Sequence, residues 1–139
     1  MSKKKILIIT ERRADYSRFK PILKIIRKEK LYDYTLIVTG SHLLKSHGYT
    51  IKEIDKDNFK SLYKIKSFSD NLKFDDGENM ILAIGKILMN ISKIIKKEKP
   101  DLILSGFDIG ANLALTIAGA HLNVPVAHIQ GGELTGSID

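Results

Sequence analysis

Short runs of consecutive apolar residues recur along this chain, and helical or polar segments separate them. The first run is Ile6 to Ile9, directly after a basic start, and Leu102 to Leu104 is another. A run without polar alternation is typical of a strand buried on both faces, as in parallel sheets covered by helices. The sequence predicts five strands in all, at residues 5–10, 34–38, 59–65, 102–104 and 126–129.

Segments with a helical period lie between the predicted strands, at residues 16–29, 48–57, 78–98 and 110–122. The clearest runs from Glu78 to Glu98, where apolar residues keep a helical spacing over about five turns until Pro100 ends the pattern. Asp15 is a candidate N-cap for the first helix. Pro21 removes an amide from the interior of that helix, so we expect the helix to start late or to kink there.

Strands that alternate with helices predict an α/β fold with right-handed crossovers. We expect a Rossmann-like parallel sheet with helices on both faces and the strand order 3-2-1-4-5, numbered along the chain. Ligands of such sheets bind beyond the carboxyl ends of the strands. Four loops fall at that edge, at residues 10–15, 39–47, 105–110 and 128–139, and they hold the candidate site.

Composition excludes several classes of function. The 139 residues suit one domain, and the absence of cysteine excludes disulfides and cysteine–metal sites. The net charge is +7 with all 23 Lys and Arg in residues 1–100. No aromatic residues interleave with these charges as a base-stacking surface needs, so we expect solvated helix faces and no nucleic-acid partner. The apolar run near the start is too short for a signal peptide or a membrane span, which predicts a cytoplasmic protein without a membrane partner.

The first loop leads into a predicted helix N-terminus, a location that favours anions. Arg12 and Arg13 could add bidentate contacts to a phosphate group. The pattern is not a glycine-rich phosphate motif, so a second interpretation stays open. In that interpretation both arginines are surface residues that pair with Glu11 and Asp15.

The last loop combines glycines with groups that handle protons. Gly131 and Gly132 let backbone amides approach a ligand closely. Proton-handling or hydrogen-bonding side chains lie on the same edge of the sheet: His128, Gln130, Glu133, Asp139 and, after the fourth strand, Asp108. Two carboxylates there could do acid–base work on a sugar carbon. The alternatives are that Asp108 caps the next helix and that His128 lies at the edge of the core; too few ligands converge to predict a metal site.

Four stretches together resemble the UDP-N-acetylglucosamine 2-epimerase family, in particular its hydrolysing branch from sialic-acid and legionaminic-acid pathways. They are RADYSRFKPILK, VTGSHLLKSHGYTIKEIDKDNF, KPDLIL and LNVPVAHIQGGELTGSID, and the last is the most specific. The resemblance implies two Rossmann-like domains facing across a cleft, a GT-B-type arrangement. Residues 1–139 would be the N-terminal domain, without the C-terminal nucleotide-binding domain.

The resemblance also implies a reaction. The enzyme removes the proton at C2 of a UDP-sugar with anti elimination of UDP, and water then adds to the glycal to release the 2-epimer. No cofactor is needed, and the full-length family implies a homodimer. The residues carried over are, for catalysis, Asp108, Glu133, Asp139 and Gln130, and, for substrate binding, Arg13, Ser17, His42, Gly131 and Gly132.

Three departures from the family pattern bear on activity. Ile109 and Ala111 stand where the family carries an arginine and a second acid after Asp108. Glu11 and Arg12 replace small residues and are expected to crowd the phosphate loop. Gln130 stands where many relatives have Glu or His. These departures keep a second hypothesis open, a non-catalytic nucleotide-sugar-binding or regulatory domain with the same fold.

Overall fold

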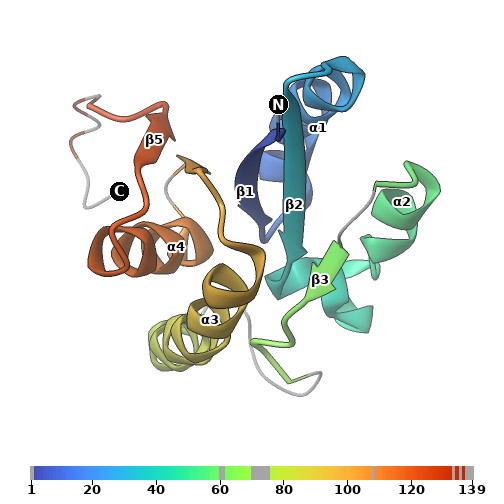
Figure 1. Ribbon diagram of the computed structural model, residues 1–139. Coiled ribbons are helices and arrows are strands. Elements are labelled where there is room, and N and C mark those ends of the chain that lie inside the picture. Colours follow the sequence, from blue (N-terminus) through green and yellow to red (C-terminus); the bar gives the residue numbers. More distant parts are fainter. Residues whose placement is uncertain are drawn as a thin grey trace.

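A computed structural model describes residues 2–59, 62–69, 76–107, 109–132, 134 and 136. Five parallel strands form one sheet: β1 (Lys4–Thr10), β2 (Tyr32–Val38), β3 (Leu62–Lys64), β4 (Leu102–Gly106) and β5 (Val126–Ile129). Their order in the sheet is β3-β2-β1-β4-β5, so the predicted order is confirmed (Figure 1).

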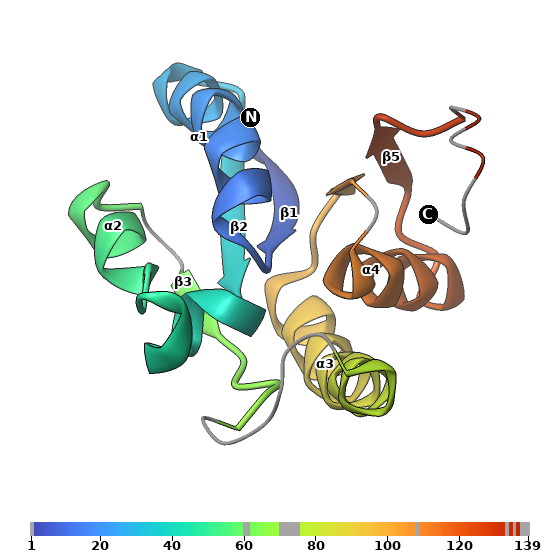
Figure 2. The same cartoon turned by 180° about the vertical axis from the view of Figure 1, so that it is seen from behind.

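Helices cover both faces of the sheet, as Figures 1 and 2 show from opposite sides. The helices are α1 (Arg13–Lys28), α2 (Ile51–Lys56), α3 (Gly77–Glu98) and α4 (Gly110–His121), with two short 3-10 turns at Gly40–Leu43 and Lys45–His47. Side chains of β1 alternate between the two layers: Leu7 and Ile9 pack with α3 and α4, whereas Ile8 packs with α1 and α2. This double burial is why β1 contains no polar alternation.

The start of α1 differs from the prediction. The helix begins at Arg13, and Pro21 lies inside it without breaking it. Asp15 is not the N-cap but the third residue of the helix, where its carboxylate accepts a hydrogen bond from the backbone of the N-cap Arg12 at 3.0 Å. This return bond stabilises the first turn, so the helix does not start late. Pro21 is exposed, and water can therefore reach the carbonyl that loses its amide partner there.

Close packing between α4 and the sheet depends on Gly119. A Cβ at this position would lie 2.6 Å from Ile103 Cδ1 and 2.8 Å from Val126 Cγ2. Small residues thus let α4 lie close to the sheet. Ala111, Ala114 and Ala118 of the same helix are buried as well.

Two glycine-to-alanine substitutions in helices should have opposite effects. Gly119→Ala is expected to lower the free energy of unfolding by about 1–2 kcal/mol, because crowding against β4 and β5 outweighs the gain in helix propensity. Gly85→Ala in α3 is the matched control, since nothing lies within 4 Å of its added Cβ, and it should stabilise by up to about 1 kcal/mol. Urea unfolding followed by circular dichroism measures both, and equal effects would contradict the packing argument.

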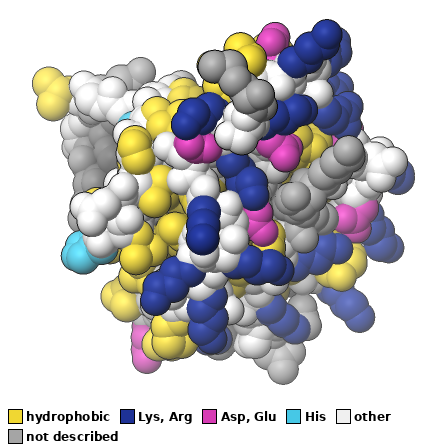
Figure 3. All heavy atoms as spheres, in the orientation of Figure 1, with side chains coloured by type: hydrophobic (Ala, Val, Ile, Leu, Met, Phe, Trp, Pro, Cys, Tyr) yellow, Lys and Arg dark blue, Asp and Glu magenta, His cyan; other side chains and the backbone are white. Residues whose placement is uncertain are grey.

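Hydrophobic side chains are also exposed on the outer side of α3 and α4. Figure 3 shows them gathered over the part of this face where these two helices lie, beside many Lys and Arg side chains. The most exposed of them in these helices are Ile81, Leu82, Met89 and Leu113. No helix among the described residues is long and apolar enough to cross a membrane.

Candidate functional site

Asp15 organises the loop between β1 and α1. Its side chain is 4% exposed and accepts hydrogen bonds from the backbone N of Glu11 at 2.9 Å and from the hydroxyl of Thr10 at 2.8 Å, besides the bond from Arg12. Burial raises the pKa of Asp15, and these hydrogen bonds act in the opposite direction. The loop that presents the two arginines is therefore held from inside the protein.

His42 belongs to the same buried network. Its Nε2 lies 3.0 Å from Thr10 Oγ1, and its Nδ1 lies 2.7 Å from Thr50 Oγ1. Thr10 donates its own proton to Asp15, so Nε2 of His42 must carry the proton donated to Thr10. Nδ1 then accepts from Thr50, which makes a one-way chain of hydrogen bonds from Thr50 to Asp15.

Burial also sets the charge of His42. The residue is fully buried, and this burial lowers the pKa of its imidazole to about 4. The ring is therefore neutral near pH 7, and its 3.9 Å approach to Asp15 is not an ion pair there. The ring of His42 is not exposed in this structure, and its contact with substrate stays a prediction. What the ring does here is support the loop between β1 and α1.

Arg13 and Ser17 lie one helical turn apart on an exposed face of α1. The Arg13 side chain is 76% exposed, and its Nε lies 3.6 Å from the carboxylate of Glu53 in α2. The hydroxyl of Ser17 donates to the carbonyl of Ala14 at 2.7 Å. A weak ion pair at this exposure is easily exchanged for another anion, so the guanidinium is available to a ligand phosphate.

Arg18 joins α1 to the loops after β4 and β5. Its Nη1 donates to Gln130 Oε1 at 2.8 Å, and its guanidinium lies 5.0 Å from the ring centroid of Phe107. Phe107 follows β4 and Gln130 follows β5, so one side chain of α1 contacts two loops at the same edge of the sheet. The structure thereby places Gln130 beside the helix that carries Arg13 and Ser17.

The two glycines after Gln130 are exposed. Gly131 lies so close to His128 that an added Cβ would be 2.3 Å from the imidazole Cδ2, while Gly132 has a left-handed φ of +88°. Three of the predicted catalytic residues, Asp108, Glu133 and Asp139, lie outside the described residues. Of the predicted site residues that the structure describes, Arg13, Ser17, Gln130 and the two glycines are exposed and His42 is buried.

The expectation that Glu11 crowds the phosphate loop is wrong. Its side chain is 5% exposed and turns toward the N-terminus of α4, where Oε2 accepts a hydrogen bond from Ala111 N at 2.9 Å. Gly40 makes room for it, because a Cβ there would lie 2.2 Å from Glu11 Cγ, and the φ of +60° also favours glycine. Burial raises the pKa of Glu11, and the bond from Ala111 opposes this shift.

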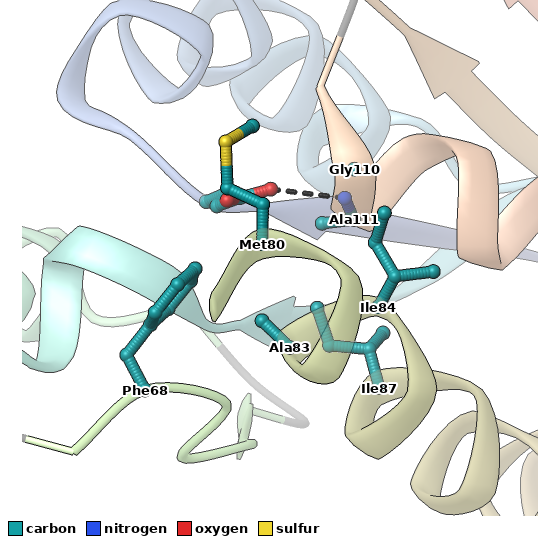
Figure 4. A pocket seen from close by; sticks show the side chains of 8 residues that line it. Phe68, Met80, Ala83, Ile84, Ile87, Gly110 and Ala111 are labelled. Atoms are coloured by element: carbon teal, nitrogen blue, oxygen red, sulfur yellow. Dashed lines mark hydrogen bonds between the residues drawn. The ribbon is translucent and has the colours of Figure 1, made fainter. Parts of the chain in front are cut away.

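Apolar side chains surround this carboxylate, as Figure 4 shows with its hydrogen bond to Ala111 dashed. Phe68, Met80, Ala83, Ile84 and Ile87 line a cavity of about 10 Å³ beside it. This volume suits about one water molecule, so the cavity is not a ligand site. No three His, Asp or Glu side chains converge for a metal ion anywhere in the described part of the chain.

Sequence reasoning missed Arg18 and the buried role of Glu11 as parts of the site. For Arg18 a signal was available, since it directly follows Ser17 in the stretch RADYSRFKPILK that carries the resemblance. For Glu11 the local sequence offers none, because its partner lies 100 residues away.

Comparison with known proteins supports the resemblance. The sequence profile of the family described as UDP-N-acetylglucosamine 2-epimerase matches residues 24–139. The UDP-N,N'-diacetylbacillosamine 2-epimerase (hydrolyzing) of Legionella pneumophila is 36% identical over 98% of this chain and 35% of that protein. The UDP-N-acetylglucosamine 2-epimerase of Neisseria meningitidis serogroup B is also 36% identical, over 98% of this chain and 34% of its own length.

Solved structures agree. The UDP-GlcNAc 2-epimerase of Methanocaldococcus jannaschii, in complex with UDP-GlcNAc and UDP, matches with a TM-score of 0.75 and 25% identity over 96% of this chain and 34% of that one. The chain thus spans about a third of the length of the relatives it matches. The profile match, the two relatives and the shared fold together show that this chain belongs to the UDP-N-acetylglucosamine 2-epimerase family.

Proposed function

We propose that this chain forms one wall of the active site of a hydrolysing UDP-sugar 2-epimerase. A base removes the proton at C2, the C1–O bond to UDP breaks on the opposite face, and a glycal forms. Water then adds its hydroxyl to C1 while a proton returns to C2 on the other face, which gives the 2-epimerised N-acetylhexosamine. The observation that carries this proposal is the hydrogen bond of Arg18 to Gln130, which holds Gln130 of the last loop against the helix that carries Arg13 and Ser17.

The residues divide into two groups by chemistry. Arg13 would bind the diphosphate, with Ser17 and the amides of Gly131 and Gly132 as further hydrogen-bonding groups. Asp108, Glu133 and Asp139 would move protons at C2 and at the leaving oxygen, because carboxylates can act as base and acid. An amide does not take up a proton near neutral pH, so Gln130 would orient the sugar or a water molecule through hydrogen bonds.

Several finer features are part of the same proposal. The sugar is an N-acetylated hexosamine of the kind used in sialic-acid or legionaminic-acid synthesis, the reaction takes place in the cytoplasm, and no cofactor takes part. The complete enzyme contains a second, nucleotide-binding domain and forms a homodimer. The exposed apolar side chains of α3 and α4 are a surface suited to such an assembly.

A second function is favoured by Ile109 and Ala111. Ile109 is the N-cap of α4 and makes no capping bond through its side chain, and Ala111 is fully buried. Neither can replace a substrate-binding arginine or an exposed acid. A domain that binds nucleotide sugars without turning them over would keep Arg13 and the glycines and lose catalysis.

Titration with UDP tests the binding site in this chain directly. We expect UDP to shift the amide resonances of residues 12–18 and 130–132 in ¹⁵N-labelled protein, with little change at β3. Arg13→Ala should weaken this binding about tenfold, since one charge-assisted contact to a phosphate is lost. Lys86→Ala is the control, because it removes the same charge from the exposed side of α3. Equal weakening by both variants would show that only the net charge attracts the nucleotide.

Turnover is tested in a chimera that joins residues 1–139 to the remaining two thirds of the Legionella relative. The chain alone should release no UDP steadily, because one wall of the cleft is missing, whereas the chimera should release UDP from a UDP-N-acetylhexosamine. A folded chimera that binds UDP-sugars without releasing UDP would favour the non-catalytic function.

A further inference from the structure

The N-terminus of α4 receives its capping group from another part of the chain. The N-cap Ile109 makes no side-chain capping bond, and no acid lies in the first turn of α4. The acceptor for Ala111 N is instead Glu11, from the loop after β1. Ala111 is the second residue of the helix, the position whose amide an N-cap side chain ordinarily satisfies.

The surroundings of Glu11 suit one carboxylate and no more. Its neighbours in the cavity are the apolar side chains of α3 and the loop after β3, and the remaining space suits about one water molecule. The backbone carbonyl of Glu11 also accepts from the hydroxyl of Ser41 at 3.1 Å. Glu11, in the loop after β1, therefore contacts both the loop after β2 and the start of α4 at the carboxyl edge of the sheet.

Compared with the family pattern that the resemblance implies, this chain has an acid more at position 11 and an acid less at position 111. The resemblance implies a small residue near position 11 and an acid at position 111, whereas this chain has Glu11 and Ala111. In the structure the carboxylate of Glu11 lies at the amide of Ala111. An acid at residue 111 would place its own carboxylate at the same helix N-terminus, where the negative charge interacts favourably with the helix dipole.

We propose that Glu11 is a positioning residue that compensates for the acid missing at position 111. Its carboxylate caps α4 and thereby holds the start of that helix against the loop that carries Arg13. Ala111 is thus the counterpart of Glu11. The kinetic part of this role rests on the proposed epimerase function.

An exchange of the two residues separates this role from simple stability. In the 139-residue chain, Glu11→Ala should speed hydrogen exchange at the amide of residue 111 about tenfold, as expected for loss of a cap. Ala111→Glu alone should destabilise, because two carboxylates would then share one apolar site. The double variant Glu11→Ala, Ala111→Glu should restore slow exchange at residue 111 and most of the stability. Glu11→Gln should stay close to the original protein, since its amide oxygen accepts the same hydrogen bond.

Kinetics in the chimera test the positioning. Glu11→Ala should lower kcat about tenfold with less than about a threefold change in KM, because the nucleotide contacts stay and a reacting group moves. The double variant should recover kcat to within about threefold of the parent. Glu98→Gln is the control. This part-buried carboxylate lies at the C-terminal end of α3 and bonds Lys5, Thr35 and Tyr63, so its loss should lower stability and leave kcat unchanged.

The proposal is overturned if the double variant is no better than the worse single variant, or if Glu11→Ala leaves exchange at residue 111 unchanged. A parent chimera that releases no UDP would count against the epimerase function alone. The exchange measurements in the 139-residue chain would still decide whether Glu11 caps α4.

Discussion

Phe19→Ala is expected to lower the free energy of unfolding by about 4 kcal/mol, the largest single effect that we predict. Phe19 is fully buried between α1 and the sheet, in a cluster with Ile8 and Leu23. Its ring also meets Phe107 edge to face, with centroids 5.1 Å apart. Removal of the ring leaves a large cavity and takes away an aromatic contact, and the two costs add.

The same substitution should reach the site. Phe19 packs against Phe107, and Phe107 in turn contacts the guanidinium of Arg18, which binds Gln130. Loss of the Phe19 ring should therefore weaken the packing of Phe107 and the position of Arg18. Urea unfolding followed by circular dichroism measures the stability, and the UDP titration measures the site. Ile25→Ala on the same helix is the control, because Ile25 is 61% exposed and should change stability by less than about 0.5 kcal/mol. A cost below about 1 kcal/mol for Phe19→Ala would contradict its place in the core.

Acidification from pH 7 to pH 4 is expected to destabilise the protein by about 3 kcal/mol through His42 alone. The pKa of its imidazole is about 4 in the folded protein, against about 6.5 in an unfolded chain. Below pH 6.5 the unfolded chain takes up a proton that the folded protein excludes, so protonation stabilises the unfolded state relative to the folded one. The contribution is fully present above pH 6.5 and is lost progressively as the pH falls toward 4.

His42→Gln isolates this contribution. The glutamine amide can donate to Thr10 and accept from Thr50 as the imidazole does, but it does not titrate. The free energies of unfolding of the two proteins, measured in urea at several pH values, should therefore converge or cross as the pH falls. Other groups, such as Asp57 with its lowered pKa and Glu11 with its raised pKa, titrate in both proteins and cancel in the difference. Parallel pH profiles would show that His42 is not held neutral.

Much of the fold could be predicted because its signals are local. The helix expected at residues 78–98 is α3 at Gly77–Glu98, and the strand expected at residues 126–129 is β5 at Val126–Ile129. Apolar periodicity and Pro100 mark these elements within a few residues of the chain. Signals were weaker at the sheet edge, where the expected strand at 59–65 is only Leu62–Lys64 among the described residues. An edge strand buries less and needs less apolar sequence.

The N-cap prediction was wrong, and the burial of one predicted site residue was not foreseen. Asp15 is a residue type typical of N-caps. Its carboxylate instead accepts hydrogen bonds from the backbone of Glu11 and Arg12, and α1 begins before it, at Arg13. His42 lies on a polar loop, and the resemblance implies a contact with substrate there. In the structure its ring is bonded to Thr10 and Thr50 in the interior. Neither outcome follows from residue type or spacing alone.

The sequence by itself determined the order of the strands, the layers of helices and the edge of the sheet at which the loops of the candidate site lie. Hydrophobic patterning and the chirality of crossovers are enough for this, because each acts between neighbouring elements. Only the tertiary structure decided that Glu11 turns away from the phosphate loop to cap α4 and that His42 is neutral and buried. Those results depend on β1 lying next to β4 and on how much water reaches each side chain, and both are properties of the packed molecule.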